Sequence, residues 1–300
     1  MSPRKTSQGL LVRKVPFQFP EDFDPHWNRA RPELSHMVNA TSLFLPYMEP
    51  FIIDTVREPT EKLTDLDFVN EVKAWIGQES QHFLQHRRYN EVLIARGYPA
   101  LREREKEIAR QYDELRKRPL EFRLAYTAGF ETMALFIGHM GLEQREYFFR
   151  GADPNVSSLW LWHLVEEIEH KNVAFDVYQR LYGGYARRLH GLVAALLHLV
   201  GMIRASYITL LETDGLWGRW RTRWAIKRIA VRFFAYLLPR LVLHDAMPWH
   251  HPSRIPDPAW MRAWVASFDK GEEGLARVDT GRIDRSAPVP DAAGSSPHAP

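Results

Sequence analysis

Two matching four-residue segments constrain the fold of this chain most strongly. One is Glu79-Ser80-Gln81-His82 and the other is Glu167-Ile168-Glu169-His170. In each, a carboxylate and an imidazole stand three residues apart, so on a helix both side chains point to the same side. A single E-x-x-H segment is a weak signal, because Glu and His meet by chance in long helices. Two copies on separate helices, with one further glutamate ahead of each, are typical of a two-metal carboxylate site inside a four-helix bundle.

The hydrophobic pattern predicts the four helices that such a site needs. Apolar residues recur every three or four positions over residues 32–57, 65–96, 120–149 and 156–181. Each apolar seam has acidic or imidazole members near its middle, where a buried unpaired carboxylate would cost several kcal/mol or lose its charge. Metal coordination would explain these side chains, which are Glu49, Glu79, His82, Glu131, Glu167 and His170. A network of buried Glu–His and Glu–Arg hydrogen bonds is the alternative.

Glu49 is the ligand candidate with the most unusual surroundings. Pro46 and Pro50 flank it, and each proline removes a helical hydrogen bond. The first helix therefore either continues with a kink or ends near Leu45, which would leave Glu49 in a turn.

The composition restricts the chemistry of the site. The chain has 300 residues, 45% of them hydrophobic and 26% charged, which is ordinary for a soluble protein. It has no cysteine, which excludes disulfides, thiolate-bound zinc, iron–sulfur clusters and cysteine nucleophiles. Four carboxylates and two imidazoles suit two iron ions, with manganese as an alternative, whereas zinc fits less well. His86 and His163 lie one turn from the candidate ligands, so we expect them to be catalytic residues that carry protons, additional ligands or hydrogen-bond partners of the ligands.

The rest of the chain completes the predicted organisation. We expect an irregular leader over 1–30, a di-metal bundle over 31–182, a helical extension over 183–270 packed on the bundle, and a disordered tail over 271–300. The charged stretch 97–119 is suited to the crossover between the two helix pairs of the bundle. Glu166 and Glu169 fall off the fourth seam and should face solvent or a neighbour. The predicted fold class is all-α, a ferritin-like four-helix bundle with a crossover helix and additional C-terminal helices.

The C-terminal extension suggests two kinds of contact. Residues 217–241 combine tryptophans and arginines in an amphipathic pattern that can lie on an anionic membrane. The alternative is that this segment packs on the bundle or on a second subunit of a homodimer. The apolar run before Arg204 falls short of the roughly 20 residues of a spanning helix. The N-terminus lacks the apolar segment of a secretory signal, so we expect a cytoplasmic location, with membrane association as an option. No motif indicates a nucleic-acid partner.

Several segments of the chain resemble a known bacterial family. They are residues 42–51, Gln78-Glu79-Ser80-Gln81-His82 with His86, Tyr89-Asn90, Glu131, residues 167–170 and Pro248-Trp249-His250-His251-Pro252. Together they resemble the proteins grouped as predicted metal-dependent hydrolases with a ferritin-like bundle, over roughly residues 12–255. This family usually has a glycine where this chain has Met48.

Three functions follow from these expectations. The first is a di-iron enzyme that oxidises a small apolar substrate with O2, in a pocket beside Glu131 lined by Thr127, Ala128, Ala134 and Gly138. The second, which the resemblance implies, is a metal-dependent hydrolase that uses a metal-bridged water; no G-x-S-x-G nucleophile motif is present. The third is a non-enzymatic metal-binding bundle.

Overall fold

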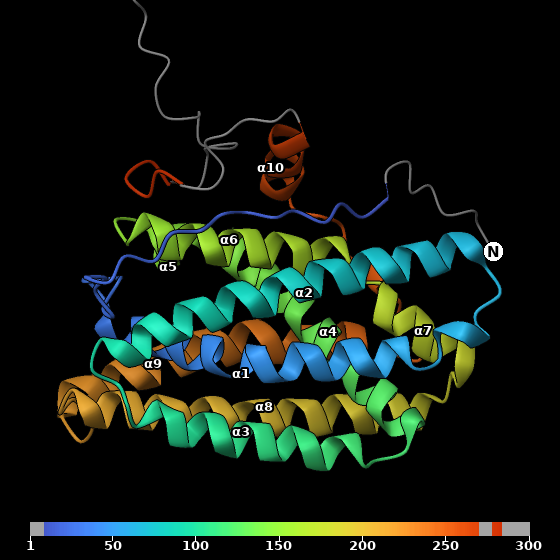
Figure 1. Cartoon of the computed structure of the whole chain (residues 1–300), viewed down its shortest axis with the longest axis horizontal. Helices are drawn as coiled ribbons and strands as arrows, with labels where there is room; N and C mark the ends of the chain where they lie inside the picture. The colour runs from blue at the N-terminus through green and yellow to red at the C-terminus, as the bar shows by residue number, and fades with distance from the viewer. Residues whose placement is uncertain (1–8, 270–277, 284–300) are drawn as a thin grey trace, which may run out of the picture.

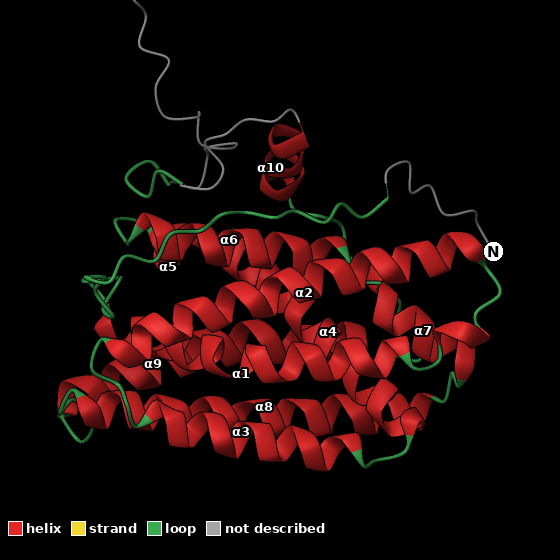
Figure 2. Cartoon of the chain, viewed as in Figure 1, coloured by secondary structure: helices red, strands yellow, loops and turns green. Residues whose placement is uncertain are grey.

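The computed structural model describes residues 9–269 and 278–283, and every regular element in these ranges is a helix (Figure 2). The all-α prediction is therefore confirmed. The helices are α1 Pro32–Arg57, η1 Thr60–Lys62, α2 Leu66–Ala95, α3 Leu101–Arg116, α4 Leu120–Glu143, α5 Arg145–Phe149, α6 Pro154–Glu169, α7 Val173–Leu181, α8 Tyr185–Thr213, α9 Trp220–Arg240, η2 Leu241–Asp245, η3 Pro252–Arg254 and α10 Ala259–Asp269.

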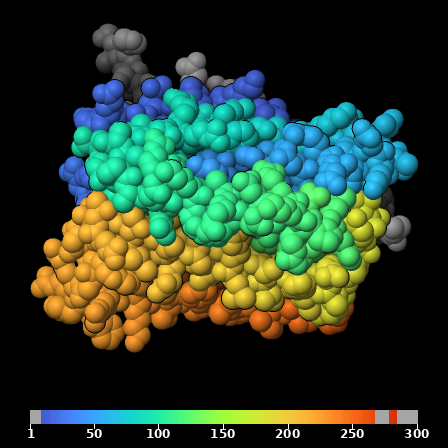
Figure 3. Space-filling view, turned by 60° about the horizontal axis from the view of Figure 1, so that its bottom comes forward, coloured from blue at the N-terminus to red at the C-terminus, as the bar shows by residue number. Residues whose placement is uncertain are grey.

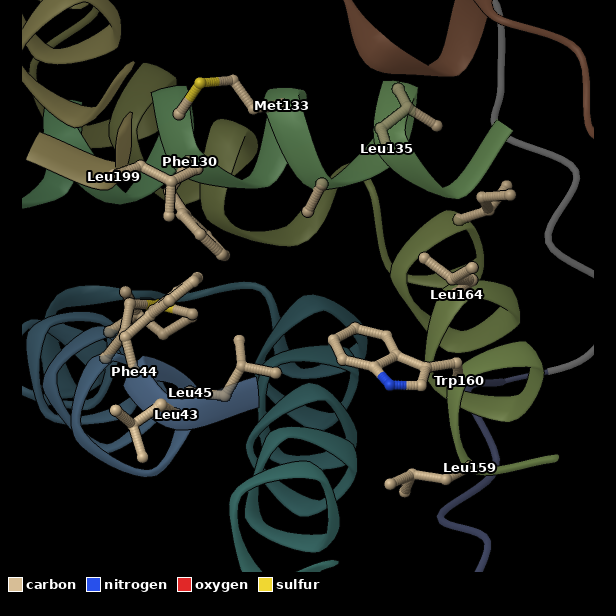
Figure 4. Close-up of a cluster of buried hydrophobic side chains, with 14 of the residues drawn as sticks. Leu43, Phe44, Leu45, Phe130, Met133, Leu135, Leu159, Trp160, Leu164 and Leu199 are labelled. Atoms are coloured by element: carbon tan, nitrogen blue, oxygen red, sulfur yellow. The ribbon is translucent and has the colours of Figure 1, made fainter. Parts of the chain in front are cut away.

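Two helix pairs form the centre of the molecule. α1 packs along α2, and α4 packs against α6 and α7 (Figure 1). The charged helix α3 connects the two pairs and lies beside α1 and α8. Between the pairs the core is filled by side chains such as Leu45 of α1, Phe130 of α4 and Trp160 of α6 (Figure 4). The helices α1, α2, α4 and α6 thus surround the central core of the molecule.

α1 continues without a break through Pro46 and Pro50, so the alternative that it ends near Leu45 is wrong. Each proline lacks the N–H that would bind the carbonyl four residues earlier, which leaves the carbonyls of Ser42 and Pro46 without their helical donors. α2 supplies both donors. Asn90 Nδ2 donates to the Ser42 carbonyl at 2.9 Å, and Arg87 Nη2 donates to the Pro46 carbonyl at 3.4 Å. These bonds keep Glu49 on a helix.

The third and fourth predicted helices are each divided in two. The third is interrupted at Gln144, between α4 and α5. The fourth begins at Pro154, where the Asp153 carboxylate caps the backbone N–H groups of Asn155 and Val156. It is interrupted at residues 170–172, so that His170 is the residue that ends α6. The second E-x-x-H segment therefore lies at a helix end instead of at mid-helix.

α8 packs on α4 with direct backbone contact. A Cβ on Gly191 would lie 2.3 Å from the Ala125 carbonyl carbon, and one on Gly129 would lie 2.5 Å from the Leu192 Cα. Among the described helices, α8 is long and apolar enough to cross a membrane by length and composition alone, because the helix continues past Arg204 to Thr213. The helix is therefore longer than the uninterrupted apolar run that ends at Arg204. In its most apolar window, 39% of the residues are already buried against the rest of the protein.

The leader runs along α2 and α6, as the blue trace in Figure 1 shows. Gln78 donates to the Leu11 carbonyl and Gln85 to the Val15 carbonyl, at 2.9 and 3.1 Å. The prediction of a disordered tail over 271–300 concerns residues that, apart from 278–283, lie outside the described ranges. Residues 278–283 differ from it, since Gly151 N donates to the Thr280 carbonyl at 3.0 Å and Val278 is buried.

Candidate metal centre

The structure brings the six candidate metal ligands together in the middle of the four central helices. Glu49 comes from α1, Glu79 and His82 from α2, and Glu131 from α4. Glu167 comes from the last turn of α6, and His170 is the C-cap residue of that helix. None of these residues is more than 3% exposed. Ligand atoms of Glu79, His82, Glu167 and His170 all lie within 4.8 Å of one another, and so do those of Glu49, His82 and His163.

The imidazoles are interleaved with the carboxylates. His170 Nε2 lies 3.0 Å from Glu79 Oε1, and its Nδ1 lies 3.1 Å from Glu131 Oε2. His82 Nδ1 lies 3.5 Å from Glu167 Oε1 and 3.8 Å from Glu79 Oε2. Both histidines therefore face carboxylates from two different side chains, as ligands grouped around neighbouring metal ions would.

The hydrogen bonds of the described residues do not satisfy this cluster. Both carboxylate oxygens of Glu49 and of Glu79 lack an aligned hydrogen-bond partner there, as do Oε1 of Glu131, Oε2 of Glu167, Nδ1 of His82 and Nε2 of His170. The 3.0 Å contact between His170 Nε2 and Glu79 Oε1 is an ion-pair distance without the alignment of a hydrogen bond. Leaving one buried polar atom unsatisfied costs about 1–3 kcal/mol, so this many at one place calls for a shared cation. The alternative of a closed Glu–His and Glu–Arg network does not account for them. Four carboxylates and two imidazoles are a ligand set that fits two hard or borderline divalent ions.

Burial and crowding of like charges shift the ionisation of the cluster. Burial raises the pKa of Glu49, and the nearby Glu79 carboxylate raises it further. Burial also raises the pKa of Glu131 to about 8. Burial opposes the charged form of His170, but Glu131 and Glu79 outweigh it and raise the pKa of that imidazole well above its usual value. Positive charge is therefore favoured among these carboxylates, whether it is carried by protons or by metal ions.

Glu166 is a part of the site that the sequence did not indicate. It was expected to face solvent or a neighbour, and it is fully buried against two neighbours. Its Oε2 lies 3.0 Å from His82 Nε2, and its Oε1 accepts a hydrogen bond from Arg13 Nη1 at 3.1 Å. Arg13 also bridges to Glu169 at 2.6 Å. A carboxylate bound to the second nitrogen of a ligating histidine fixes the ring and raises its basicity.

A hydrogen-bonded chain extends from the cluster through His163 and His86, both buried. Because Asn90 Nδ2 donates to the Ser42 carbonyl, Asn90 Oδ1 must accept from the Ser42 hydroxyl, at 2.7 Å. Ser42 Oγ then accepts from His86 Nδ1 at 2.8 Å. His86 Nε2 is left as the acceptor for His163 Nδ1–H, at 3.2 Å.

This order of donors fixes the role of the last nitrogen in the chain. Burial lowers the pKa of both His86 and His163, with a neighbouring imidazole lowering each further, so the neutral forms are favoured. In neutral His163 the Nε2 atom carries a lone pair, and it lies 3.2 Å from Glu167 Oε1. Two acceptor atoms that face each other at this distance need a cation between them. His163 Nε2 is therefore placed either to bind a metal or to take up a proton at the cluster.

An apolar cavity of about 330 Å³ lies beside the hydrogen-bonded side chains of His86 and His163, between α1, α4, α6, α8 and α9. Trp160 lies between the cavity and His86, because it lines the cavity and its ring centre is 4.8 Å from that of His86. Figure 4 shows Trp160 reaching from α6 towards Leu45 of α1. Other lining residues are Val38, Ile137, Leu164, Tyr207 and Phe233.

The small residues beside Glu131 were expected to line a pocket, and the apolar cavity is not that pocket. None of Thr127, Ala128, Ala134 and Gly138 lines the cavity. Helix α6 fills the space beside Gly138, since a Cβ there would lie 2.9 Å from the Leu164 carbonyl oxygen.

Comparison with known proteins agrees with this geometry. Residues 11–255 match the family described as predicted metal-dependent hydrolases, and the chain belongs to this family. No curated protein and no solved structure matches it.

Proposed function

We propose that this member of the predicted metal-dependent hydrolases is an enzyme with a two-metal carboxylate centre in a ferritin-like bundle, and that it hydrolyses an ester or amide bond in an apolar substrate. The observation that carries the proposal is the set of buried ligand atoms that converge from four helices without hydrogen-bond partners among the described residues. The proposed ligands are Glu49, Glu79, His82, Glu131, Glu167 and His170. The carboxylate-rich set favours iron or manganese over zinc.

The protein's own residues would handle the proton of the reaction. Bound divalent metals supply Lewis acidity and lower the pKa of water, which is the chemistry that hydrolysis needs. We assign the role of general base to His163, because its Nε2 lone pair faces the cluster next to Glu167. His86 orients it by accepting the hydrogen bond of Nδ1–H. A proton held at His163 Nε2 would be stabilised by the Glu167 carboxylate 3.2 Å away.

The cavity suggests the class of substrate. Its lining residues are almost all aliphatic or aromatic, and Trp160 is the side chain between it and the two histidines. An aliphatic or aromatic group held in the cavity would place a bond near the metal centre once the Trp160 ring rotates. Apolar pockets with a few polar groups at one end are the usual form of small-molecule sites.

An O2-dependent di-iron oxidase is the second candidate, and one observation favours it. Four buried carboxylates surround two imidazoles, which is the ligand ratio of di-iron carboxylate bundles that react with oxygen. A metal-binding bundle without activity is the third.

One experiment separates these functions. The purified chain is depleted of metal and reloaded with Mn(II), Zn(II) or Fe(II) without oxygen, and each form is assayed against a panel of aryl and alkyl esters and amides. Hydrolysis by the Mn(II) or Zn(II) form supports the proposal. Oxygen consumption by the Fe(II) form, with no hydrolysis by any form, would replace it with the oxidase. If the protein binds two metals but shows neither activity, the non-enzymatic metal-binding bundle is the remaining function.

A further inference from the structure

A second group of metal-binding side chains lies outside the bundle centre. His26 of the leader, His36 in the second turn of α1 and Asp214 at the end of α8 meet at one point. Both histidine Nε2 atoms lie 2.6 Å from Asp214 Oδ2, and they lie 3.1 Å from each other. We propose that these three residues form a mononuclear site for a divalent transition-metal ion such as Zn²⁺.

The geometry differs from that of an ordinary surface ion pair. His251 and Asp176 form such a pair, with one nitrogen 2.8 Å from one oxygen. In the cluster, two imidazole nitrogens point at the same oxygen and at each other. Ligands bound to zinc at 2.0–2.2 Å in a tetrahedron are about 3.3–3.6 Å apart. The three atoms are 2.6–3.1 Å apart, so they already converge on one point and would spread by less than about 1 Å to take the ion.

The surroundings of Asp214 support a ligand role. The Tyr98 hydroxyl lies 2.9 Å from Oδ1 and 3.1 Å from Oδ2, so it donates to the carboxylate and holds its orientation. Hydrogen bonds of this kind to ligating carboxylates are a regular feature of metal sites. His36 is fully buried, and of its two ring nitrogens Nε2 is the one directed at Asp214 and His26.

The site is separate from the bundle centre and accessible. His36 precedes Glu49 by thirteen residues on the same helix, which places the two about 20 Å apart along its axis. The His26 side chain is 36% exposed and that of Asp214 is 16% exposed, so a water can complete the coordination. Two imidazoles and one carboxylate suit zinc and similar borderline ions better than Mg²⁺ or Ca²⁺.

A metal here would connect three segments that are distant in sequence. It would link the leader to α1 and to the turn between α8 and α9. Residues of α9 line the apolar cavity. Because a ligand that binds the folded state stabilises it, zinc should raise the unfolding temperature through this site.

The test is metal uptake by the full chain, measured by Co(II) titration, which reports coordination through visible absorption, and by elemental analysis after gel filtration with Zn(II). His26→Ala and Asp214→Asn should each lose about one metal equivalent and the zinc-dependent rise in unfolding temperature. His251→Ala, which removes a histidine of similar exposure from an ordinary ion pair, should keep both. The two cluster variants replace partly exposed side chains, and circular dichroism checks that they are folded.

Two results would overturn the proposal. One is wild-type stoichiometry and affinity in both cluster variants. The other is that the Glu79→Gln variant, which lacks the bundle ions, retains no metal. Conversely, the Glu79→Gln variant should retain one zinc, and the double variant Glu79→Gln with His26→Ala should lose it. This pair of results would establish the site, whether or not the proposed hydrolysis is found.

Discussion

Oε2 of Glu166 lies 3.0 Å from Nε2 of His82, and this contact leaves Nδ1 of His82 directed at Glu79 and Glu167. One buried carboxylate thus determines which nitrogen of the ring is offered to a metal. Glu166 is itself held by Arg13 of the leader at 3.1 Å. The leader therefore supports the proposed metal centre, although none of the candidate ligands belongs to the leader.

Glu166→Gln should weaken metal binding without removing a ligand. The amide keeps the shape of the side chain but loses the charge that makes His82 basic, and changes of this kind cost about 10–100-fold in metal affinity. Competition with a chromophoric chelator measures the effect. Glu169→Gln is the matched control, because Glu169 also binds Arg13 but does not contact His82. Equal affinity in Glu166→Gln and wild type would contradict the role assigned to Glu166.

Removing a ligand should have a larger effect. We expect Glu79→Gln and Glu167→Gln to reduce bound metal from about two ions per chain towards none, because each carboxylate lies between two imidazoles of the cluster. Elemental analysis of the purified variants measures this. Glu105→Gln provides the control, since Glu105 of α3 is also buried, at 8% exposure, but is paired with Arg102. A metal content near two in both cluster variants would mean that the metals are bound elsewhere.

His163 and His86 should differ in their effect on turnover. If His163 is the general base, His163→Ala should lower kcat by about 10²–10⁴-fold and remove the acidic limb of the pH–rate profile. His86→Ala should keep that limb with a smaller loss, because His86 acts by orienting His163. If instead His163 binds a metal, His163→Ala loses metal affinity together with rate. Affinity and pH profile measured on the same preparations distinguish the two roles.

The sequence predicted the helices and the six converging side chains because both depend on local periodicity. Glu49 remained ambiguous because its two prolines are compensated by Asn90 and Arg87 of another helix, and no local pattern reveals such donors. Glu166 was missed for a related reason. The periodicity of apolar residues predicts one buried face for each helix, whereas α6 is covered by α2 on one side and by the leader on another.

The close contact between α4 and α8 gives a prediction for stability. Gly191→Ala would place a Cβ 2.3 Å from the Ala125 carbonyl carbon and oxygen, which are backbone atoms that cannot yield locally. We expect the free energy of unfolding to fall by about 3 kcal/mol or more. Gly201→Ala, in the same helix, has nothing within 4 Å of the new atom and should stabilise the protein by about 0.5–1 kcal/mol. Denaturant unfolding of both variants tests the pair, and equal stability would disprove the close crossing.

We also propose that α9 contacts anionic membranes, and its surface makes this testable. Trp217, Trp220 and Trp224 are 45%, 67% and 57% exposed, and exposed arginines lie among them. Residues of α8 and α9, yellow to orange in Figure 3, form one continuous side of the molecule. Tryptophan supports insertion at the lipid interface, and each basic residue near an anionic surface contributes about 1 kcal/mol.

Co-sedimentation with vesicles measures this contact. The wild-type chain should bind vesicles rich in phosphatidylserine more tightly than neutral ones, and less tightly as salt is raised. Arg223→Ser should weaken binding about fivefold, the equivalent of about 1 kcal/mol, whereas Lys106→Ser on α3 should leave it unchanged because that lysine is paired with Glu103 away from the tryptophans. Trp220→Ala with Trp224→Ala should weaken binding to both kinds of vesicle, since it removes the apolar contribution. Binding that is insensitive to Arg223 and to both tryptophans would show that α9 is not the contacting surface.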